Sequence, residues 1–138
     1  MVKVFWDTSV LVRYFTRDDE SKYKEVVNLY ERVADGRVVP YVSTIVLMEL
    51  YYVLNSVYAF GKEKCLSAVR AVMEMRNCVI VGKTDIKQAM KCLEETGVKL
   101  SDCIIATQVP KRVKFITYDK EFSRIEALNK VPLGKLIA

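Results

Sequence analysis

The chain has 138 residues, of which 51% are hydrophobic, and its 22 Lys and Arg outnumber its 17 Asp and Glu, for a net charge of +5. A chain of this length fits one domain, residues 1–138, that buries roughly 68% of its unfolded surface. Its apolar runs are too short or too interrupted by charge to span a bilayer, and the amino end lacks a signal-peptide pattern. We therefore expect a soluble, cytoplasmic protein with no membrane contact.

Histidine is absent from the sequence. Its absence removes the usual general base near neutral pH, the nucleophile pairs that depend on histidine, and histidine zinc ligands. If the protein is an enzyme, carboxylates and hard metal ions are its expected tools.

The positive net charge and a pI near 9.0 favour a polyanionic partner such as nucleic acid. The cysteines, Cys65, Cys78, Cys92 and Cys103, contain no Cys-x-x-Cys pair, so neither a zinc site nor a redox motif is supported. We interpret them as small buried apolar residues. A disulfide becomes plausible if the source is a hyperthermophile, which the abundance of Lys, Arg and Glu weakly suggests.

Apolar and β-branched runs alternate with segments of helical periodicity along the chain. Strands are predicted at 2–6, 38–43, 78–81 and 113–117, and helices at 8–15, 18–34, 44–58, 61–75, 84–96 and 101–109. A short helical or turn segment is expected at 120–128, and a last edge strand at 131–137. This alternation predicts an α/β fold, a three-layer α/β/α sandwich around a parallel sheet of about four to five strands.

Four acidic residues should meet at one edge of this sheet. Asp7 ends the first strand, Glu49 lies in the second turn of the helix after the second strand, and Asp119 follows the fourth strand. Asp102 is in the first turn of the helix that feeds the fourth strand, and such a helix begins near the edge where that strand finishes. Thr117 should lie beside them. This carboxyl edge is where open α/β sheets bind ligands.

The surroundings of two of these acids leave other interpretations open. Asp7 could simply cap the helix that follows it. Glu49 is the only charge in a helix that is apolar nearly all round, so it must either face solvent or be compensated by a cation, a metal or hydrogen bonds.

Clustered carboxylates repel one another unless a cation is present. Mg²⁺ or Mn²⁺, bound through oxygen ligands, resolves that repulsion, activates water and stabilises charge on a phosphoryl oxygen. Phosphodiester hydrolysis is therefore the reaction that this set of residues favours.

Four sequence segments resemble those of PIN-domain ribonucleases, and more narrowly of VapC-type toxins from prokaryotic toxin–antitoxin pairs. They are Asp-Thr-Ser-Val-Leu-Val-Arg-Tyr-Phe at 7–15, Met-Glu-Leu at 48–50, Ser-Asp-Cys-Ile-Ile-Ala-Thr at 101–107 and Phe-Ile-Thr-Tyr-Asp-Lys-Glu-Phe at 115–122. The resemblance covers nearly the whole chain, in order and spacing. Its one departure is Cys103, where the family often has a small residue such as alanine.

The resemblance implies a divalent-metal-dependent endoribonuclease. The metal-binding and catalytic acids of the family fall on Asp7, Glu49, Asp102 and Asp119. The family's hydroxyl residue two positions before the last acid falls on Thr117. Ser9 matches a position near the metal and is a candidate for binding substrate. The family also implies a homodimer and a VapB-type antitoxin that crosses the active-site groove, with Tyr51 and Tyr52 as candidate contacts.

Basic side chains near the carboxyl edge, Arg13 and Lys120 among them, are candidates for binding RNA phosphates. The alternative function is a catalytically silent PIN-like module that binds RNA or protein. An aspartyl phosphatase has a second acid two residues after the first, and Ser9 occupies that position here, which argues against this class. A receiver domain has paired acids near its first strand, and these are missing. The sequence favours the ribonuclease.

Overall fold

Four parallel strands form a single sheet in the computed structural model, which describes residues 1–138. The strands are β1 (Val2–Trp6), β2 (Val38–Ser43), β3 (Val79–Val81) and β4 (Lys114–Ile116), in the order β3-β2-β1-β4. β1 is central because it pairs with both β2 and β4, placing Phe5 opposite Tyr41 and Phe115. The predicted parallel sheet is confirmed, with four strands.

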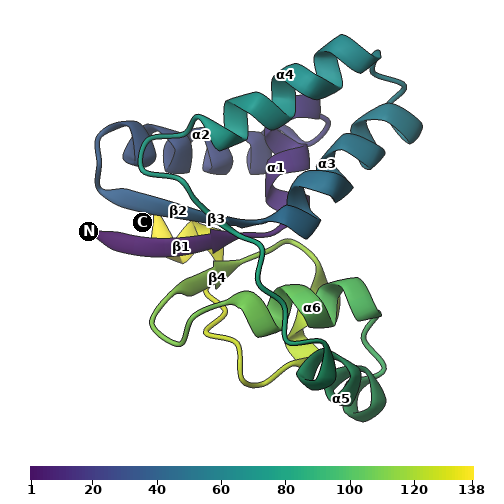
Figure 1. The fold of residues 1–138 in the computed structure, drawn as a ribbon. Coiled ribbons are helices and arrows are strands. Elements are labelled where there is room, and N and C mark those ends of the chain that lie inside the picture. Colours follow the sequence, from purple (N-terminus) through teal and green to yellow (C-terminus); the bar gives the residue numbers. More distant parts are fainter.

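Helices cover both faces of the sheet, as the predicted three-layer sandwich requires. In Figure 1 the sheet separates α1 to α4 from α5 and α6. The helices are α1 (Thr8–Thr16), α2 (Glu20–Ala34), α3 (Thr44–Ser56), α4 (Lys62–Met73), α5 (Ile86–Thr96), α6 (Leu100–Gln108) and α7 (Leu133–Leu136), with a 3₁₀ helix, η1 (Lys120–Arg124).

Side-chain caps fix where several helices begin. Asp19, Ser43 and Asp85 accept hydrogen bonds from backbone N–H groups at the starts of α2, α3 and α5. α5 ends at Gly97, whose φ of 71° is a left-handed conformation that glycine adopts readily. Asp18, where we expected α2 to begin, lies outside this helix and forms an ion pair with Arg13.

The main hydrophobic core lies between the sheet and its helices. It contains 24 buried residues, among them Trp6, Phe5 and Phe115, which are fully buried. A second, small cluster of Ala89, Val98 and Cys103 lies between α5 and α6. This separate packing means that α5 depends on α6 for its burial.

The predicted edge strand at 131–137 is wrong. The segment around Lys130 pairs with β4 only through one isolated bridge, between Phe115 and Lys130. Hydrogen bonds from Phe115 N to Asn129 O and from Val131 N to Phe115 O support this bridge. Pro132 then has no N–H to continue a ladder, and the chain turns into α7. The sheet therefore ends at β4.

Screening the helices for length and apolar character finds none that could cross a membrane.

Candidate active site

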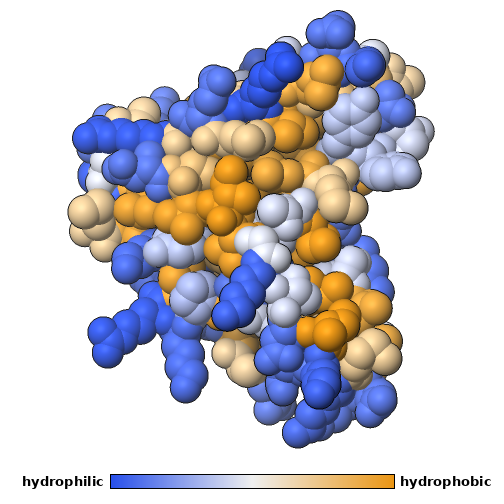
Figure 2. All heavy atoms as spheres, viewed as in Figure 1, coloured by the Kyte–Doolittle hydropathy of each residue, from blue (hydrophilic) through white to orange (hydrophobic).

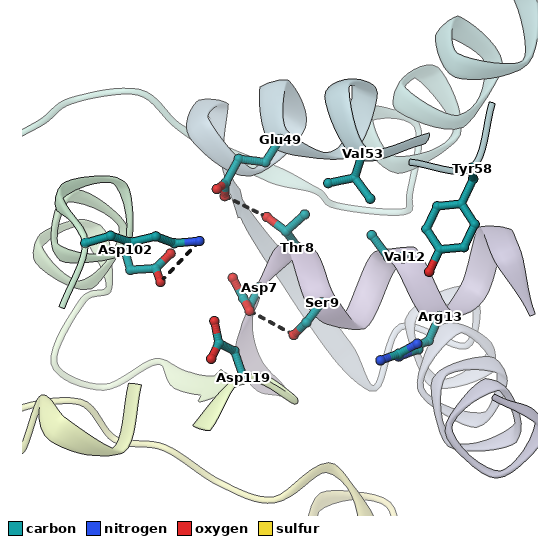
Figure 3. A pocket seen from close by; sticks show the side chains of 11 residues that line it. Asp7, Thr8, Ser9, Val12, Arg13, Glu49, Val53, Tyr58, Asp102 and Asp119 are labelled. Carbon is teal, nitrogen blue, oxygen red and sulfur yellow. Dashed lines mark hydrogen bonds and ion pairs between the residues drawn. The ribbon is translucent and has the colours of Figure 1, made fainter. Parts of the chain in front are cut away.

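A cavity of about 220 Å³ opens at the carboxyl ends of the central strands. In Figure 3 the carboxylates of Asp7, Glu49, Asp102 and Asp119 point towards a common space, from four different segments of the chain. The remaining lining residues are Thr8, Ser9, Val12, Arg13, Val53, Tyr58 and Lys99. The four acids are far apart in the sequence but line one pocket, because all four segments reach the same edge of the sheet.

Asp7 is 4% exposed and is held by two hydroxyl groups. Its Oδ2 accepts hydrogen bonds from Thr117 Oγ1 at 2.6 Å and from Ser9 Oγ at 2.8 Å. Burial raises the pKa of Asp7, and these hydrogen bonds oppose that rise. Although Asp7 precedes α1, its side chain makes no capping hydrogen bond, so capping does not explain its presence.

Glu49 is half-buried and faces the pocket from α3. Its Oε1 accepts a hydrogen bond from Thr8 Oγ1 at 2.9 Å. Burial raises the pKa of Glu49, and the nearby charges of Asp7 and Asp119 raise it further, while the hydrogen bond from Thr8 and the charge of Lys99 lower it. Glu49 is therefore no outward-facing surface side chain.

Asp102 is the carboxylate with the fewest partners. It is 3% exposed, and its Oδ2 is buried without a hydrogen bond. Lys99 Nζ lies 3.8 Å from this oxygen, which is close enough for an ion pair but too long for a hydrogen bond. Burial raises the pKa of Asp102 to about 7 despite the lysine. The pocket thus contains a buried oxygen that lacks a ligand or donor.

Asp119 and Thr117 follow β4 in one tight turn. The Asp119 N–H donates to Thr117 Oγ1 at 2.9 Å, and Asp119 Oδ1 accepts from the backbone N–H of Glu121 at the start of η1. Thr117 does not line the cavity but reaches it through its hydrogen bond to Asp7. The turn therefore fixes both Asp119 and the hydroxyl that orients Asp7.

The three residues predicted to bind substrate lie in different surroundings. Ser9 lines the pocket and also accepts a hydrogen bond from the backbone N–H of Tyr118. Arg13 lines it too, but its Nη1 donates to both oxygens of Asp18, at 2.9 and 3.0 Å. Lys120 is exposed on η1 and is not among the lining residues.

Sequence reasoning missed five lining residues: the apolar Val12 and Val53, and the polar Thr8, Lys99 and Tyr58. Thr8 is adjacent to Asp7, and Lys99 is three residues before Asp102, so each could have been found from its spacing to a predicted acid. Tyr58 could not, because no predicted acid is close to it in sequence and its hydroxyl is held by a hydrogen bond to Asp18 at 2.6 Å, a contact between distant segments.

The donor set suits a hard divalent cation such as Mg²⁺, which prefers carboxylate oxygens and retains several waters. The unpartnered Asp102 Oδ2 is the clearest sign of such a fit, because a buried carboxylate oxygen without a partner is costly. As placed, no three acidic or cysteine side chains converge closely enough to hold a metal ion. The negative charges of the four carboxylates repel one another, which keeps them apart. Hydrogen bonds from Thr8 to Glu49, and from Ser9 and Thr117 to Asp7, hold two of them in these positions.

Comparison with protein-family models matches residues 4–128 to the PIN domain. The match spans most of the chain, which therefore belongs to the PIN-domain family. No curated protein sequence matches significantly.

Solved structures share the fold at low sequence identity. VapBC2 from Rickettsia felis, solved bound to a DNA fragment from its promoter, gives a TM-score of 0.67 at 20% identity, covering 95% of this chain and 98% of that one. PAE2754 from Pyrobaculum aerophilum gives 0.66 at 12%, covering 99% and 87%. Mycobacterium tuberculosis VapC20, described as a sarcin–ricin loop cleaving toxin, gives 0.64 at 17%, covering 91% and 97%.

Proposed function

We propose that this protein is a Mg²⁺- or Mn²⁺-dependent endoribonuclease and the toxin of a type II toxin–antitoxin pair. The observation that carries the proposal is the convergence of four carboxylates on one pocket, one of them with an unpartnered buried oxygen. The fold shared with an RNA-cleaving toxin supports RNA as the substrate. The basic net charge agrees.

Asp7, Glu49, Asp102 and Asp119 would hold the cation in this reaction. When bound, such a cation activates water and offsets the negative charge that develops on a phosphoryl oxygen. Thr117 and Ser9 orient Asp7, and Thr8 orients Glu49. Orienting hydrogen bonds of this kind fix ligands and raise their affinity for metal.

Two positively charged side chains in the lining of the pocket suit the approach of a phosphate backbone. Lys99 comes from the amino end of α6 and Arg13 from α1, and both line the pocket. Lys99 is the freer of the two, since its only ion pair is the long contact to Asp102, whereas Asp18 engages Arg13. We infer that Lys99 binds a phosphate next to the scissile bond. Lys120, on the exposed 3₁₀ helix, would act farther along the RNA.

The test is cleavage of a labelled structured RNA in Mg²⁺, Mn²⁺ or EDTA by the protein and by the variants Asp7→Asn and Asp102→Asn. The matched control is Asp85→Asn, which changes a carboxylate that lines a different cavity. We expect metal-dependent cuts that the control retains and both pocket variants lose. Cutting in EDTA, or equal cutting by all four proteins, would rule out this site.

A catalytically silent PIN-like module is the second candidate, and one observation favours it: the acids are not gathered into a preformed metal site. Such a module would bind the labelled RNA without cutting it in any metal. It would also bind no Mn²⁺ in a calorimetric titration, whereas the ribonuclease should bind the ion and lose that binding in Asp102→Asn.

We further propose a VapB-type antitoxin and a homodimer as partners. Met48 and Tyr52 are 60% and 71% exposed on α3, one turn apart and beside the pocket-lining Glu49 and Val53. An apolar segment crossing the pocket would cover them, as would be expected of an antitoxin. Tyr51, the other tyrosine considered, packs against the core instead.

Tyr52→Glu should abolish co-purification with the product of the adjacent gene while RNA cleavage persists. The cytoplasmic location stays a prediction.

A further inference from the structure

Two of the four cysteines meet between α5 and α6, on the face of the sheet opposite α1 to α4 (Figure 1). Cys103 is fully buried in the small cluster between these helices, and Cys92 packs against that cluster. The side chain of Cys92 lies beside the Cys103 thiol. The other two cysteines, Cys65 and Cys78, pack in the main core.

Helices α5 and α6 and the short turn between them form a helical hairpin. Local hydrogen bonds hold each thiol on the inner face of this hairpin. Cys103 Sγ donates to Val98 O at 3.2 Å, and Cys92 Sγ lies 3.9 Å from Thr96 Oγ1. Thr96 in turn accepts the N–H of Val98, so the turn joining α5 to α6 connects the surroundings of both sulfurs. The pair is therefore positioned by the fold of the hairpin and not by chance contact of mobile side chains.

A small reagent can reach Cys92. Cys92 and Cys103 both line a cavity of about 370 Å³, together with apolar residues that include Ala106, Ile125 and Leu128. Cys92 is partly exposed and Cys103 is buried. Cys92 is therefore the thiol that an incoming oxidant meets first, with Cys103 behind it as the second sulfur.

The packing of α5 against α6 is limited, so a cross-link between these helices would add stability there. Ala89 is the only fully buried residue of α5, and the helix packs chiefly against α6. Few buried apolar contacts imply that α5 opens more readily than the main core. A covalent link between the helices would act directly on that opening.

We propose that Cys92 and Cys103 are a modification site, an oxidisable thiol pair that closes to an intramolecular disulfide. A low-molecular-weight disulfide is the oxidant class. Cys92 sulfur attacks it, forms a mixed disulfide and releases one thiol; Cys103 sulfur then displaces the second thiol. The protein loses two hydrogen atoms, and the reagent disulfide is reduced to two thiols.

The disulfide ties α5 to α6 at the residue that follows Asp102. It closes a short loop, restricting the unfolded chain and stabilising the hairpin. We expect the melting temperature to rise by roughly 5–10 °C. Amide hydrogen exchange in α5 should slow on oxidation and recover on reduction.

The experiment incubates the full chain with glutathione disulfide and counts free thiols, followed by peptide mapping without reduction. We expect the thiol count to fall from four to two, with one linked peptide pair that joins Cys92 to Cys103 and a monomeric or dimeric size unchanged by oxidation. Retention of four thiols would overturn the proposal, and so would links that involve Cys65, Cys78 or a second molecule.

Two variants guard against misreading. The double variant Cys65→Ala/Cys78→Ala keeps Cys92 and Cys103 as its only thiols. On oxidation it should lose both thiols and gain thermal stability. Cys92→Ser changes one atom at a partly exposed position and should keep all three of its thiols unlinked within the chain. A stability gain on oxidation that persists in Cys92→Ser would contradict the assignment. None of these readouts depends on RNA cleavage or metal.

Discussion

Hydroxyl side chains determine where two of the pocket acids lie. Thr8 donates to Glu49, and removing that donor leaves Glu49 free to rotate away from the other carboxylates. We expect Thr8→Val to weaken Mn²⁺ binding roughly 10–100-fold, the usual effect of losing a partner of a metal ligand. Calorimetric titration measures this. Thr44→Val, which changes an exposed threonine at the start of α3, should bind Mn²⁺ like the parent protein.

Asp102 should make the metal-free protein less stable as pH rises. Burial raises its pKa from 3.8 to about 7, so between these values the folded protein holds a proton that the unfolded chain has released. The free energy of unfolding is then highest at the acidic end of this range and falls by about 1.4 kcal/mol for each pH unit. Asp7 and Glu49, whose pKa values are also raised, act in the same direction.

Urea unfolding in EDTA at pH 5 and pH 8 measures this dependence. Asp102→Asn should flatten it, because the amide carries no charge at either pH. A free energy of unfolding that increases with pH to the same extent in both proteins would contradict the role given to burial.

The convergence of the four acids on one pocket could be predicted from the sequence because each follows a strand or lies in the first or second turn of a helix that begins at one sheet edge. Their partners were harder to predict. The spacing of Thr8 to Asp7 and of Lys99 to Asp102 points to these two residues, but it does not show that Thr8 donates to Glu49 from a distant segment. Asp18, expected at a helix start, instead contacts Arg13 and Tyr58. Side-chain contacts between distant segments were thus the part that sequence patterns did not contain.

At the scale of elements, buried and exposed helix caps should differ in their contribution to stability. Ser43 is fully buried, and its hydroxyl accepts the N–H of Ile45 at the start of α3, the helix that carries Glu49. Ser43→Ala should lower the free energy of unfolding by about 1–2 kcal/mol. Asp85→Ala, at the exposed cap of α5, should cost about 0.5 kcal/mol. Equal losses in urea unfolding would show that burial of the cap does not matter.

The predicted bounds of α2 and α5 show where local chemistry sets a helix boundary. The predicted ends at 34 and 96 match the structure, whereas the predicted starts at 18 and 84 lie two residues before Glu20 and Ile86, because Asp19 and Asp85 act as caps outside the helices. The segment 131–137 failed because its apolar residues resemble a strand while Pro132 forbids the ladder. A single residue without an N–H outweighed the hydrophobic pattern.

For the whole molecule, sheet order leaves β3 as an edge strand with apolar residues exposed. Val79 and Ile80 are 37% and 41% exposed, and Figure 2 shows apolar atoms gathered across the middle of the face where β3 runs in Figure 1. β3 ends beside the start of α3, because Gly82 lies against Thr44. Soluble proteins usually protect such an edge, so this face is where we place the proposed homodimer contact.

A charge placed on that edge should separate the two subunits. Ile80→Lys puts an ammonium group at the centre of the contact, where burying it unpaired is costly, and the variant should elute as a monomer with its melting temperature nearly unchanged. Ile86→Lys is the matched control, because Ile86 is 50% exposed on α5 and lies outside the sheet edge. Light scattering after size exclusion gives both masses. If Ile80→Lys stays dimeric while Ile86→Lys dissociates, the contact lies on α5 instead, and if the parent protein is itself monomeric, β3 serves a different partner.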